Sequence, residues 1–280
     1  MSKKRAFICD SSIVSNNPAN NEGIHIQPLY IIIDEVSSKD YFEMKPENFY
    51  DAVATGKITK TSQPAPGDFI EIFEKIKAEG VEEVFVFLIS SGISGTFQTA
   101  QMAKEMFDGI DIHVIDTKTT TAGTMMALKE IFAYAKTGAT ASEIIEYSEK
   151  NFAAIDIYAY IGDLEPLRRG GRLSAAQATF GNMLQIKPII TVNHQTGEID
   201  VLEKLRTEKK TFNRVMELVE NGTIAKVCLL KTTDEALFAR FEAVFKEKYP
   251  NIEYEVEFVN PVVGAHVGLS VVGIAVQREV

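Results

Sequence analysis

Short apolar runs alternate with segments of helical periodicity along the whole chain, and this alternation constrains the fold more than any other feature of the sequence. The pattern is typical of an α/β protein, in which helices cover a sheet. Phe69, Ile72, Phe73 and Ile76 recur at helical spacing, so we predict an amphipathic helix over residues 66–80 that forms a crossover unit between two strands. The strand candidates of the first half are residues 5–10, 25–33, 83–90 and 111–116.

The second half predicts a different sheet. Several of its apolar runs alternate in polarity, as in residues 253–259, so we expect a mixed six-stranded sheet with helices on one face and water on the other. The change of pattern near Phe152 divides the chain into an N-terminal parallel-sheet α/β/α domain, residues 1–152, and a C-terminal mixed-sheet α/β domain, residues 153–280. The strand candidates are residues 155–162, 187–193, 198–205, 225–232, 253–260 and 271–277, with a hairpin turn at 195–198.

The charge balance limits the partners. The chain has 29 Lys and Arg against 39 Asp and Glu, a net charge of −10 at pH 7. Such a surface repels phosphate backbones and anionic lipids, so we expect no nucleic-acid partner and at most a transient membrane contact. An anionic ligand would therefore need a local site rich in N–H groups or basic side chains.

Targeting signals and metal-ligand patterns are absent from the sequence. No apolar stretch is long enough for a signal peptide or a membrane span, which predicts a cytoplasmic protein. Cys9 and Cys228 lie in apolar runs and the four histidines are scattered, so we predict reduced core thiols, no metal and no cofactor.

Small hydroxyl and glycine residues follow the strand candidate at 83–90, in the order Ser-Ser-Gly-Ile-Ser-Gly-Thr from Ser90 to Thr96. A strand that runs through such a loop into a helix brings hydroxyls and free N–H groups to the edge where α/β sheets bind ligands, and this predicts an anion site. A plain N-cap and turn is the alternative. A second hydroxyl loop at 59–66 contains Thr61 and Ser62, although by itself it fits an extended, capped connection.

An arginine-rich loop and one histidine are further candidates. Arg168, Arg169 and Arg172 concentrate positive charge in an acidic protein, and a guanidinium binds carboxylates or phosphates. A solvated basic loop explains these arginines equally well. His266 lies among small residues, where a structural histidine and a ligand contact are both reasonable. No nucleotide-binding signature occurs, and Thr96 replaces the second glycine of a nucleophile elbow.

Six segments, several of them described above, together resemble the DegV family, in family order and spacing and across the whole chain. They are residues 61–64, 89–98, 167–173, 184–189, 204–207 and 264–268. The resemblance implies an N-terminal α/β domain, a C-terminal mixed six-stranded domain, and a fatty acid bound in an apolar tunnel with its carboxylate at the domain junction. Members of this kind are the lipid-carrying subunit of bacterial fatty acid kinase, in which a separate ATP-binding kinase phosphorylates the bound carboxylate.

The resemblance also assigns residues. Thr61 and Ser94 match the family's carboxylate-binding hydroxyls and His266 matches its site histidine; with the neighbouring Ser62 and Gly95 they form the predicted head-group site. Arg172 and Arg206 match basic positions near the pocket mouth, and together with Arg169 they form the predicted docking rim for the kinase. One departure is Leu269-Ser270, where the family has proline and glycine, which we expect to add bulk beside the histidine.

We therefore predict a carrier of a long-chain fatty acid that has no catalytic site of its own. Two alternatives remain. Ser94, Asp163 and His266 occur in the order of an α/β-hydrolase triad, which would make the chain a serine hydrolase. A regulatory module that binds another protein through the basic loop and keeps lipid only as a structural ligand is the second.

Overall fold

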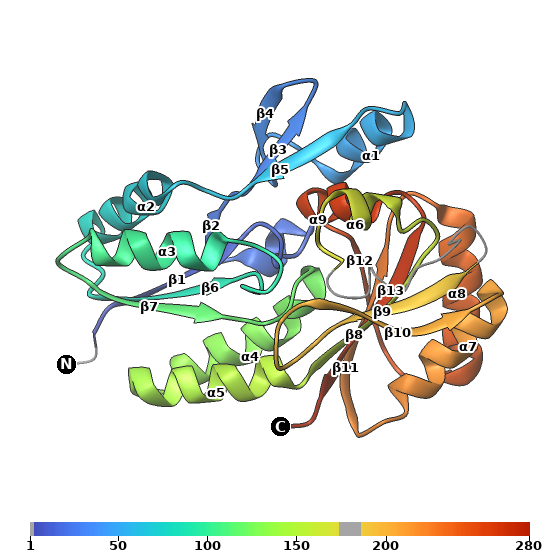
Figure 1. Cartoon of the computed structure of the whole chain (residues 1–280). Helices are drawn as coiled ribbons and strands as arrows, with labels where there is room; N and C mark the ends of the chain where they lie inside the picture. The colour runs from blue at the N-terminus through green and yellow to red at the C-terminus, as the bar shows by residue number, and fades with distance from the viewer. Residues whose placement is uncertain (1–2, 174–185) are drawn as a thin grey trace.

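A four-stranded parallel sheet forms the centre of the N-terminal half in the computed structural model, which describes residues 3–173 and 186–280. Helices cover both of its faces (Figure 1), as predicted. The strands, in spatial order, are β2 (His25–Gln27), β1 (Arg5–Asp10), β6 (Glu83–Leu88) and β7 (Asp111–Asp116). The helices α2 (Pro66–Ala78) and α3 (Thr96–Glu105) lie on one face, and α4 (Met125–Ala135) and α5 (Ala141–Ala153) on the other.

The central strand β6 is buried at every residue because both of its faces are covered. Val84 and Val86 pack against the side of α2 and α3, whereas Phe85 and Phe87 pack against that of α4 and α5. This is why the strand appears in the sequence as a continuous apolar run rather than an alternating one.

A small antiparallel sheet departs from the prediction. Residues 25–33 do not form one strand, because the chain leaves the parallel sheet at Pro28, which has no N–H to continue it. Beyond the proline, β3 (Tyr30–Ile33) pairs with β4 (Val36–Lys39) and β5 (Thr59–Ser62). With α1 (Pro46–Ala54), this sheet packs on α9 (Pro261–Val267) of the other half.

The C-terminal half is a six-stranded mixed sheet with α7 (Glu208–Val219) and α8 (Glu235–Lys248) on one face, as predicted. The opposite face is not exposed to water, which corrects the expectation from polarity. Ile157, Ile190 and Leu230 on that face share one core with α4 and α5. In spatial order the strands are β10 (Ile199–Leu205), β9 (Lys187–Val192), β8 (Ile155–Ile161), β13 (Val271–Arg278), β11 (Ile224–Lys231) and β12 (Glu255–Phe258).

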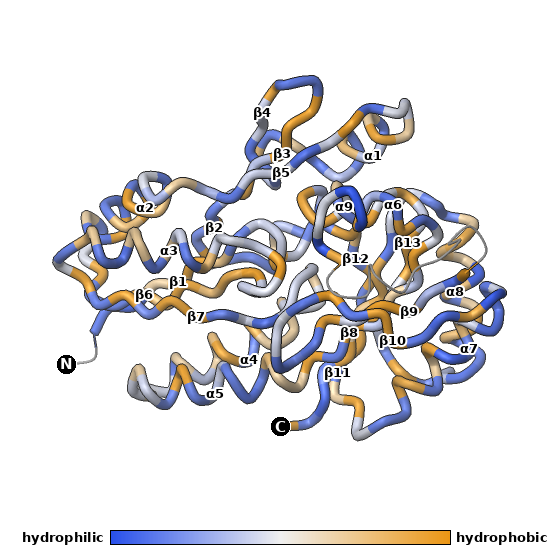
Figure 2. The backbone as a smooth tube through the Cα atoms, in the orientation of Figure 1, coloured by the Kyte–Doolittle hydropathy of each residue, from blue (hydrophilic) through white to orange (hydrophobic). Residues whose placement is uncertain are grey.

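The alternating polarity that suggested a wet face belongs to strands at the sheet edges. In Figure 2 the inner strands are coloured as hydrophobic, while the helices at the periphery alternate between hydrophobic and hydrophilic turns. The predicted division at residue 152 falls where α5 gives way to β8, and we keep it as a proposal. None of the helices in the described ranges is long and apolar enough to cross a membrane.

Candidate functional site

A small cavity lies where the loops at the carboxyl ends of the parallel strands meet β5 and α9. Its volume is about 50 Å³, and we call it the head chamber. Its apolar wall is formed by Leu29, Ile89, Ile93, Ile199, Val262, Val263 and Val267, and its polar side chains are Thr61, Ser94, Thr120, Arg172 and His266. The fold therefore brings three of the five predicted head-group residues, Thr61, Ser94 and His266, into one cavity with Arg172 of the predicted docking rim.

Thr61 and His266 are in direct contact. Alternation along β5 turns Thr61 inward, and its Oγ1 lies 2.8 Å from Nε2 of His266 in the last turn of α9. A Cβ atom on Gly170 would stand 2.5 Å from Nδ1 of the same ring, so the glycine of the arginine-rich loop makes room for the histidine. Burial, helped by the charge of Arg172, lowers the pKa of His266 to about 4. The imidazole is therefore neutral at pH 7 and has one N–H to donate.

Ser94 lies in a loop that the C-terminal half holds in place. Its Oγ is 2.8 Å from Oγ1 of Thr96, the first residue of α3. A Cβ on Gly92 would meet the backbone of Gly197 at 2.6 Å, and Ser90 Oγ donates to the Gly197 carbonyl at 2.7 Å. The hairpin between β9 and β10 thus packs directly against the hydroxyl loop and fixes its shape.

Two of the predicted head-group residues lie outside the head chamber lining. Ser62 is on the opposite side of β5, exposed, with its hydroxyl donating to the Gln63 carbonyl at 3.1 Å. Gly95 immediately precedes α3, where a Cβ would collide with the Gln63 side chain, which approaches to 2.0 Å. The structure thus brings Gly95 against Gln63.

A second cavity, also about 50 Å³, adjoins the first, and we call it the apolar chamber. It lies against the inner face of the six-stranded sheet, which explains why that face is apolar. Thr120, Ile199, Val263 and Val267 line both chambers. The rest of the lining is Thr121, Ile157, Ala159, Ile161, Ile190, Thr191, Val192, Leu230, Val259, Val271 and Gly273.

A wider hollow of about 330 Å³ lies on the other side of the head chamber, and we call it the outer hollow. Thr61, Arg172 and His266 line both, and Arg169 lines the outer hollow alone. Arg172 donates to the carbonyl oxygens of Gly170 at 2.6 Å and Ile93 at 3.3 Å, which ties the arginine-rich loop to the hydroxyl loop. Shared lining residues thus connect the outer hollow to the head chamber and the head chamber to the apolar chamber.

The remaining arginines lie elsewhere. Arg168 makes a bidentate ion pair with Glu165 on α6 (Glu165–Arg169), with both bonds 2.7 Å and both side chains exposed. Arg206 follows the end of β10, seven residues from Ile199, which is roughly 20 Å along an extended strand. It does not line any of the three cavities of the described chain.

The residues of the hydrolase alternative have other partners. Nε2 of His266 contacts Thr61, Ser94 contacts Thr96, and Oδ1 of Asp163 accepts the N–H of Glu165 at 2.9 Å. No hydrogen bond joins Ser94, Asp163 and His266 to one another in the part of the chain that the structure describes, so no catalytic triad is assembled there. Within residues 3–173 and 186–280, no three His, Cys, Asp or Glu residues gather to hold a metal ion.

Leu269-Ser270 does not crowd the histidine. The Leu269 carbonyl accepts from Oγ1 of Thr232, and its side chain packs in the cluster beneath α1. Ser270 bonds Asp234 at 3.1 Å through its hydroxyl and accepts the N–H of Gly162 at 2.8 Å. Of the segment 184–189 in the family resemblance, residues 184 and 185 lie outside the described residues.

Buried acids hold the loops together behind the head chamber. Asp10, at the end of β1, accepts the N–H of Ile89 at 2.5 Å and the N–H of Ser12 at 2.8 Å. Its burial raises its pKa to about 6, although these hydrogen bonds work in the opposite direction. Ser11 donates to Asp40 at 2.8 Å, and burial raises the pKa of Asp40 to about 7.

Sequence reasoning missed Thr120. It belongs to a segment with four threonines in five positions, residues 117–121, directly after β7. Hydroxyl residues at the end of a parallel strand were the signal that identified the Ser90 loop, and the same signal applied to β7 would have found this segment.

Comparison with known proteins identifies the family and agrees with the fold. The profile described as "Uncharacterised protein, DegV family" matches residues 4–279. A DegV domain-containing protein of Listeria innocua is 34% identical over 98% of both chains. Among solved structures, a fatty acid binding DegV family protein of Streptococcus agalactiae superposes with a TM-score of 0.90 at 26% identity, covering 100% of both chains. DegV of Bacillus subtilis, described as a fatty acid binding protein, superposes with a TM-score of 0.89 at 28% identity, covering 99% of this chain and 100% of that one. The chain belongs to the DegV family.

Proposed function

We propose that this chain binds a long-chain fatty acid, holds its carboxylate in the head chamber, and presents it to a separate ATP-dependent kinase that forms the acyl phosphate. The observation that carries the proposal is the adjoining pair of chambers, one with Thr61, Ser94 and His266 and the other lined by aliphatic side chains. The fatty-acid-binding descriptions of the Streptococcus agalactiae and Bacillus subtilis relatives support it.

The two chambers contribute to binding in different ways: one buries the acyl chain and the other forms hydrogen bonds with the carboxylate. Burial of an acyl chain contributes about 0.8 kcal/mol per methylene, so about 14 methylenes contribute on the order of 11 kcal/mol. A hydrogen bond to a charged carboxylate contributes about 1.5–3 kcal/mol. The apolar chamber therefore sets affinity, and the head chamber sets orientation. Since each chamber is about 50 Å³, the aliphatic side chains shift to admit a long chain.

The head chamber offers donors that do not add charge. Thr61 and Ser94 each have a hydroxyl hydrogen, and when Nε2 of neutral His266 donates its N–H to Oγ1 of Thr61, the Thr61 hydroxyl is free to donate to a ligand. Together they can satisfy a buried carboxylate, whose transfer from water is costly without such bonds. The positive charge of Arg172 at the wall adds attraction for the anion.

The outer hollow supports the kinase step. It adjoins the head chamber, so a phosphoryl donor placed there reaches the carboxylate without crossing the apolar chamber. Arg169 and Arg172 give this entrance positive charge in a protein of net charge −10. We propose a cytoplasmic site of action, which the two buried free thiols, Cys9 and Cys228, support.

Native mass spectrometry of gently isolated protein tests the binding step. We expect an adduct with the mass of a fatty acid of about 14–18 carbons, since that length gives a burial term several times larger than the head-group term. Repeated recovery of empty protein that also ignores added hexadecanoate would contradict the proposal.

Adding an ATP-binding fatty acid kinase subunit tests the second step. Acyl phosphate should form from hexadecanoate only when this chain is present. If the kinase acts equally well without it, the chain is not a presenting subunit, and the regulatory alternative gains support. A fluorophosphonate probe should leave Ser94 unlabelled, because its hydroxyl contacts Thr96 rather than a base.

A further inference from the structure

The segment after β7 contains hydroxyl groups that an unsubstituted fatty acid would leave without a hydrogen-bond partner. The Oγ1 atoms of Thr119, Thr120 and Thr121 are buried and have no hydrogen-bond partner within the described residues. Buried hydroxyls normally have a partner, and valine would fill the same space without needing one. Two of these three threonines line a chamber, and Thr120 lines both.

The backbone of the segment is held in place on all sides. The Thr119 carbonyl accepts the N–H of Ser90 at 3.0 Å, and the Thr120 carbonyl accepts the hydroxyl of Thr124 at 2.9 Å. Thr121 has φ +72°, a conformation that β-branched residues rarely adopt. A Cβ on Gly123 would stand 2.3 Å from Cβ of Ala275, so the segment lies directly on β13. Thr120 is therefore presented to the chambers from a fixed position.

Thr120 stands at the junction of the two chambers. Of the four residues that line both, Ile199, Val263 and Val267 are apolar, so Thr120 is the one that carries a hydroxyl group. Rotation about its Cα–Cβ bond exchanges the hydroxyl with the methyl group at the wall. By contrast, Thr121 lines only the apolar chamber, and Thr119 lines neither.

We infer that this chain binds fatty acids that carry a hydroxyl group on carbon 2 or 3, and that Thr120 forms a hydrogen bond with that hydroxyl. The inference rests on the proposed function, because a carboxylate held by Thr61 and Ser94 in a chamber of about 50 Å³ brings the first carbons of the acyl chain to the junction. The substituent and Thr120 then satisfy each other at a position otherwise surrounded by aliphatic groups.

Competition against a fluorescent fatty acid tests the inference, with hexadecanoate, 2-hydroxyhexadecanoate and 3-hydroxyhexadecanoate as ligands. In the wild type, at least one hydroxy acid should bind about 2- to 10-fold tighter than hexadecanoate, the ratio expected for one neutral hydrogen bond. Thr120→Val should abolish this ratio, because it should weaken binding of the preferred hydroxy acid about 2- to 10-fold more than binding of hexadecanoate. Thr119→Val, a matched control off the chambers, should preserve the ratio, and Thr120→Ser, which keeps the hydroxyl, should preserve it too.

The outcomes separate this inference from the proposed function. If hexadecanoate binds but the ratio is the same in wild type and Thr120→Val, the hydroxy-acid preference is wrong and the carrier function stands. If Thr120→Val weakens all three acids equally, Thr120 binds the carboxylate, and the inferred ligand class is again wrong. Failure of all three acids to bind the wild type would overturn the proposed function itself.

Discussion

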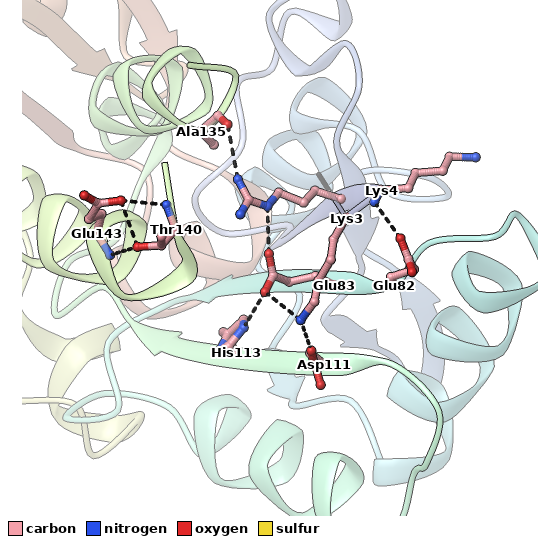
Figure 3. Close-up of polar contacts among 10 residues, drawn as sticks. Lys3, Lys4, Glu82, Glu83, Asp111, His113, Ala135, Thr140 and Glu143 are labelled. Atoms are coloured by element: carbon pink, nitrogen blue, oxygen red, sulfur yellow. Dashed lines mark hydrogen bonds and ion pairs between the residues drawn. The ribbon is translucent and has the colours of Figure 1, made fainter. Parts of the chain in front are cut away.

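The two ends of the parallel sheet use their polar side chains in different ways. At the amino end, charged residues on neighbouring strands satisfy one another (Figure 3): Arg5 donates to Glu83 at 2.7 Å, and His113 and Lys3 lie 3.4 and 3.6 Å from the same carboxylate. At the carboxyl end, hydroxyls, His266 and Arg172 share the head chamber with aliphatic side chains, and three threonine hydroxyls have no partner within the described residues.

The amino end of the sheet therefore contributes to stability, and the carboxyl end to ligand binding. Burial would raise the pKa of Glu83, but the bonds from Arg5 and His113 outweigh it and lower that pKa below its ordinary value of 4.5. The ion pairs of the amino end therefore favour the folded state. The carboxyl end keeps polar groups available for a ligand, and it is the place where the two halves of the chain meet.

The largest effect should come from removing the ion pair between Arg5 and Glu83 at the amino end of the sheet. Glu83→Ala leaves the half-buried Arg5 without its partner and should lower the free energy of unfolding by about 3 kcal/mol, the low end for loss of a buried ion-pair partner. Hexadecanoate affinity of the folded protein should not change. Urea unfolding and a binding titration measure the two quantities. The neighbouring Glu82→Ala, at an exposed position, is the control and should cost less than about 0.5 kcal/mol.

His266 at the carboxyl end and Glu83 at the amino end should lose their contributions to stability in different pH ranges. The pKa of His266 falls from 6.5 to about 4 on folding, so the unfolded chain binds more protons between these values, and the folded state loses stability as pH falls through that range. The loss from this group is up to roughly 3 kcal/mol. Glu83, whose pKa is lowered, loses its contribution only as pH falls further, below 4.5.

Asp10 and Asp40 have raised pKa values, so between pH 4 and 7 they stabilise the folded state as pH falls, opposite to His266. His266→Gln separates the contribution of the histidine from theirs. Unfolding energies of wild type and variant should diverge in their pH dependence between pH 6.5 and 4. Parallel curves would show that His266 titrates normally.

A moderate effect should follow from Ser94→Ala at the carboxyl end. Loss of a donor to a shielded carboxylate should weaken hexadecanoate binding by about 1.5–3 kcal/mol, roughly 10- to 150-fold, while the free energy of unfolding changes little. Ser62→Ala is the matched control, because that hydroxyl lies on the outer side of β5. Equal losses in the two variants would contradict the assignment of the head chamber.

The smallest effect should be at the outer hollow. Arg169→Ala should slow acyl-phosphate formation by an added kinase about 2- to 5-fold, since exposed charges contribute up to about 1 kcal/mol, and the effect should shrink as salt rises. Fatty-acid affinity should stay the same. Arg206→Ala, at the far end of β10, should leave both quantities unchanged; a larger loss in Arg206→Ala than in Arg169→Ala would place the docking surface elsewhere.

The sequence was sufficient for the parallel sheet because its strands are buried apolar runs with helical segments between them. It was not sufficient for the small antiparallel sheet. The strand at Val36–Lys39 has no apolar pattern, and its pairing with β3 and β5 depends on a break at Pro28 that a continuous apolar run conceals. The prediction that one face of the C-terminal sheet is exposed to water was wrong because it was drawn from alternation in edge strands, whereas the central strands are covered on both faces.

The head chamber could be predicted only from the family resemblance. Thr61 and His266 are 205 residues apart, and no local pattern connects them. That Ser62 faces outward follows from alternation, but only once residues 59–62 are known to be a strand. The role of Gly170 depends on a ring nearly 100 positions away along the chain, which spacing alone does not reveal.

A crystal structure of the chain with bound hexadecanoate tests the assignment of the two chambers most directly. The carboxylate should lie within about 3.2 Å of Oγ1 of Thr61 and Oγ of Ser94. The acyl chain should pass Thr120 and lie against Ile157 and Ile190 of the six-stranded sheet. A carboxylate in the outer hollow with the acyl chain in solvent, or an acid bound in the separate groove lined by Phe97 and His113, would contradict it.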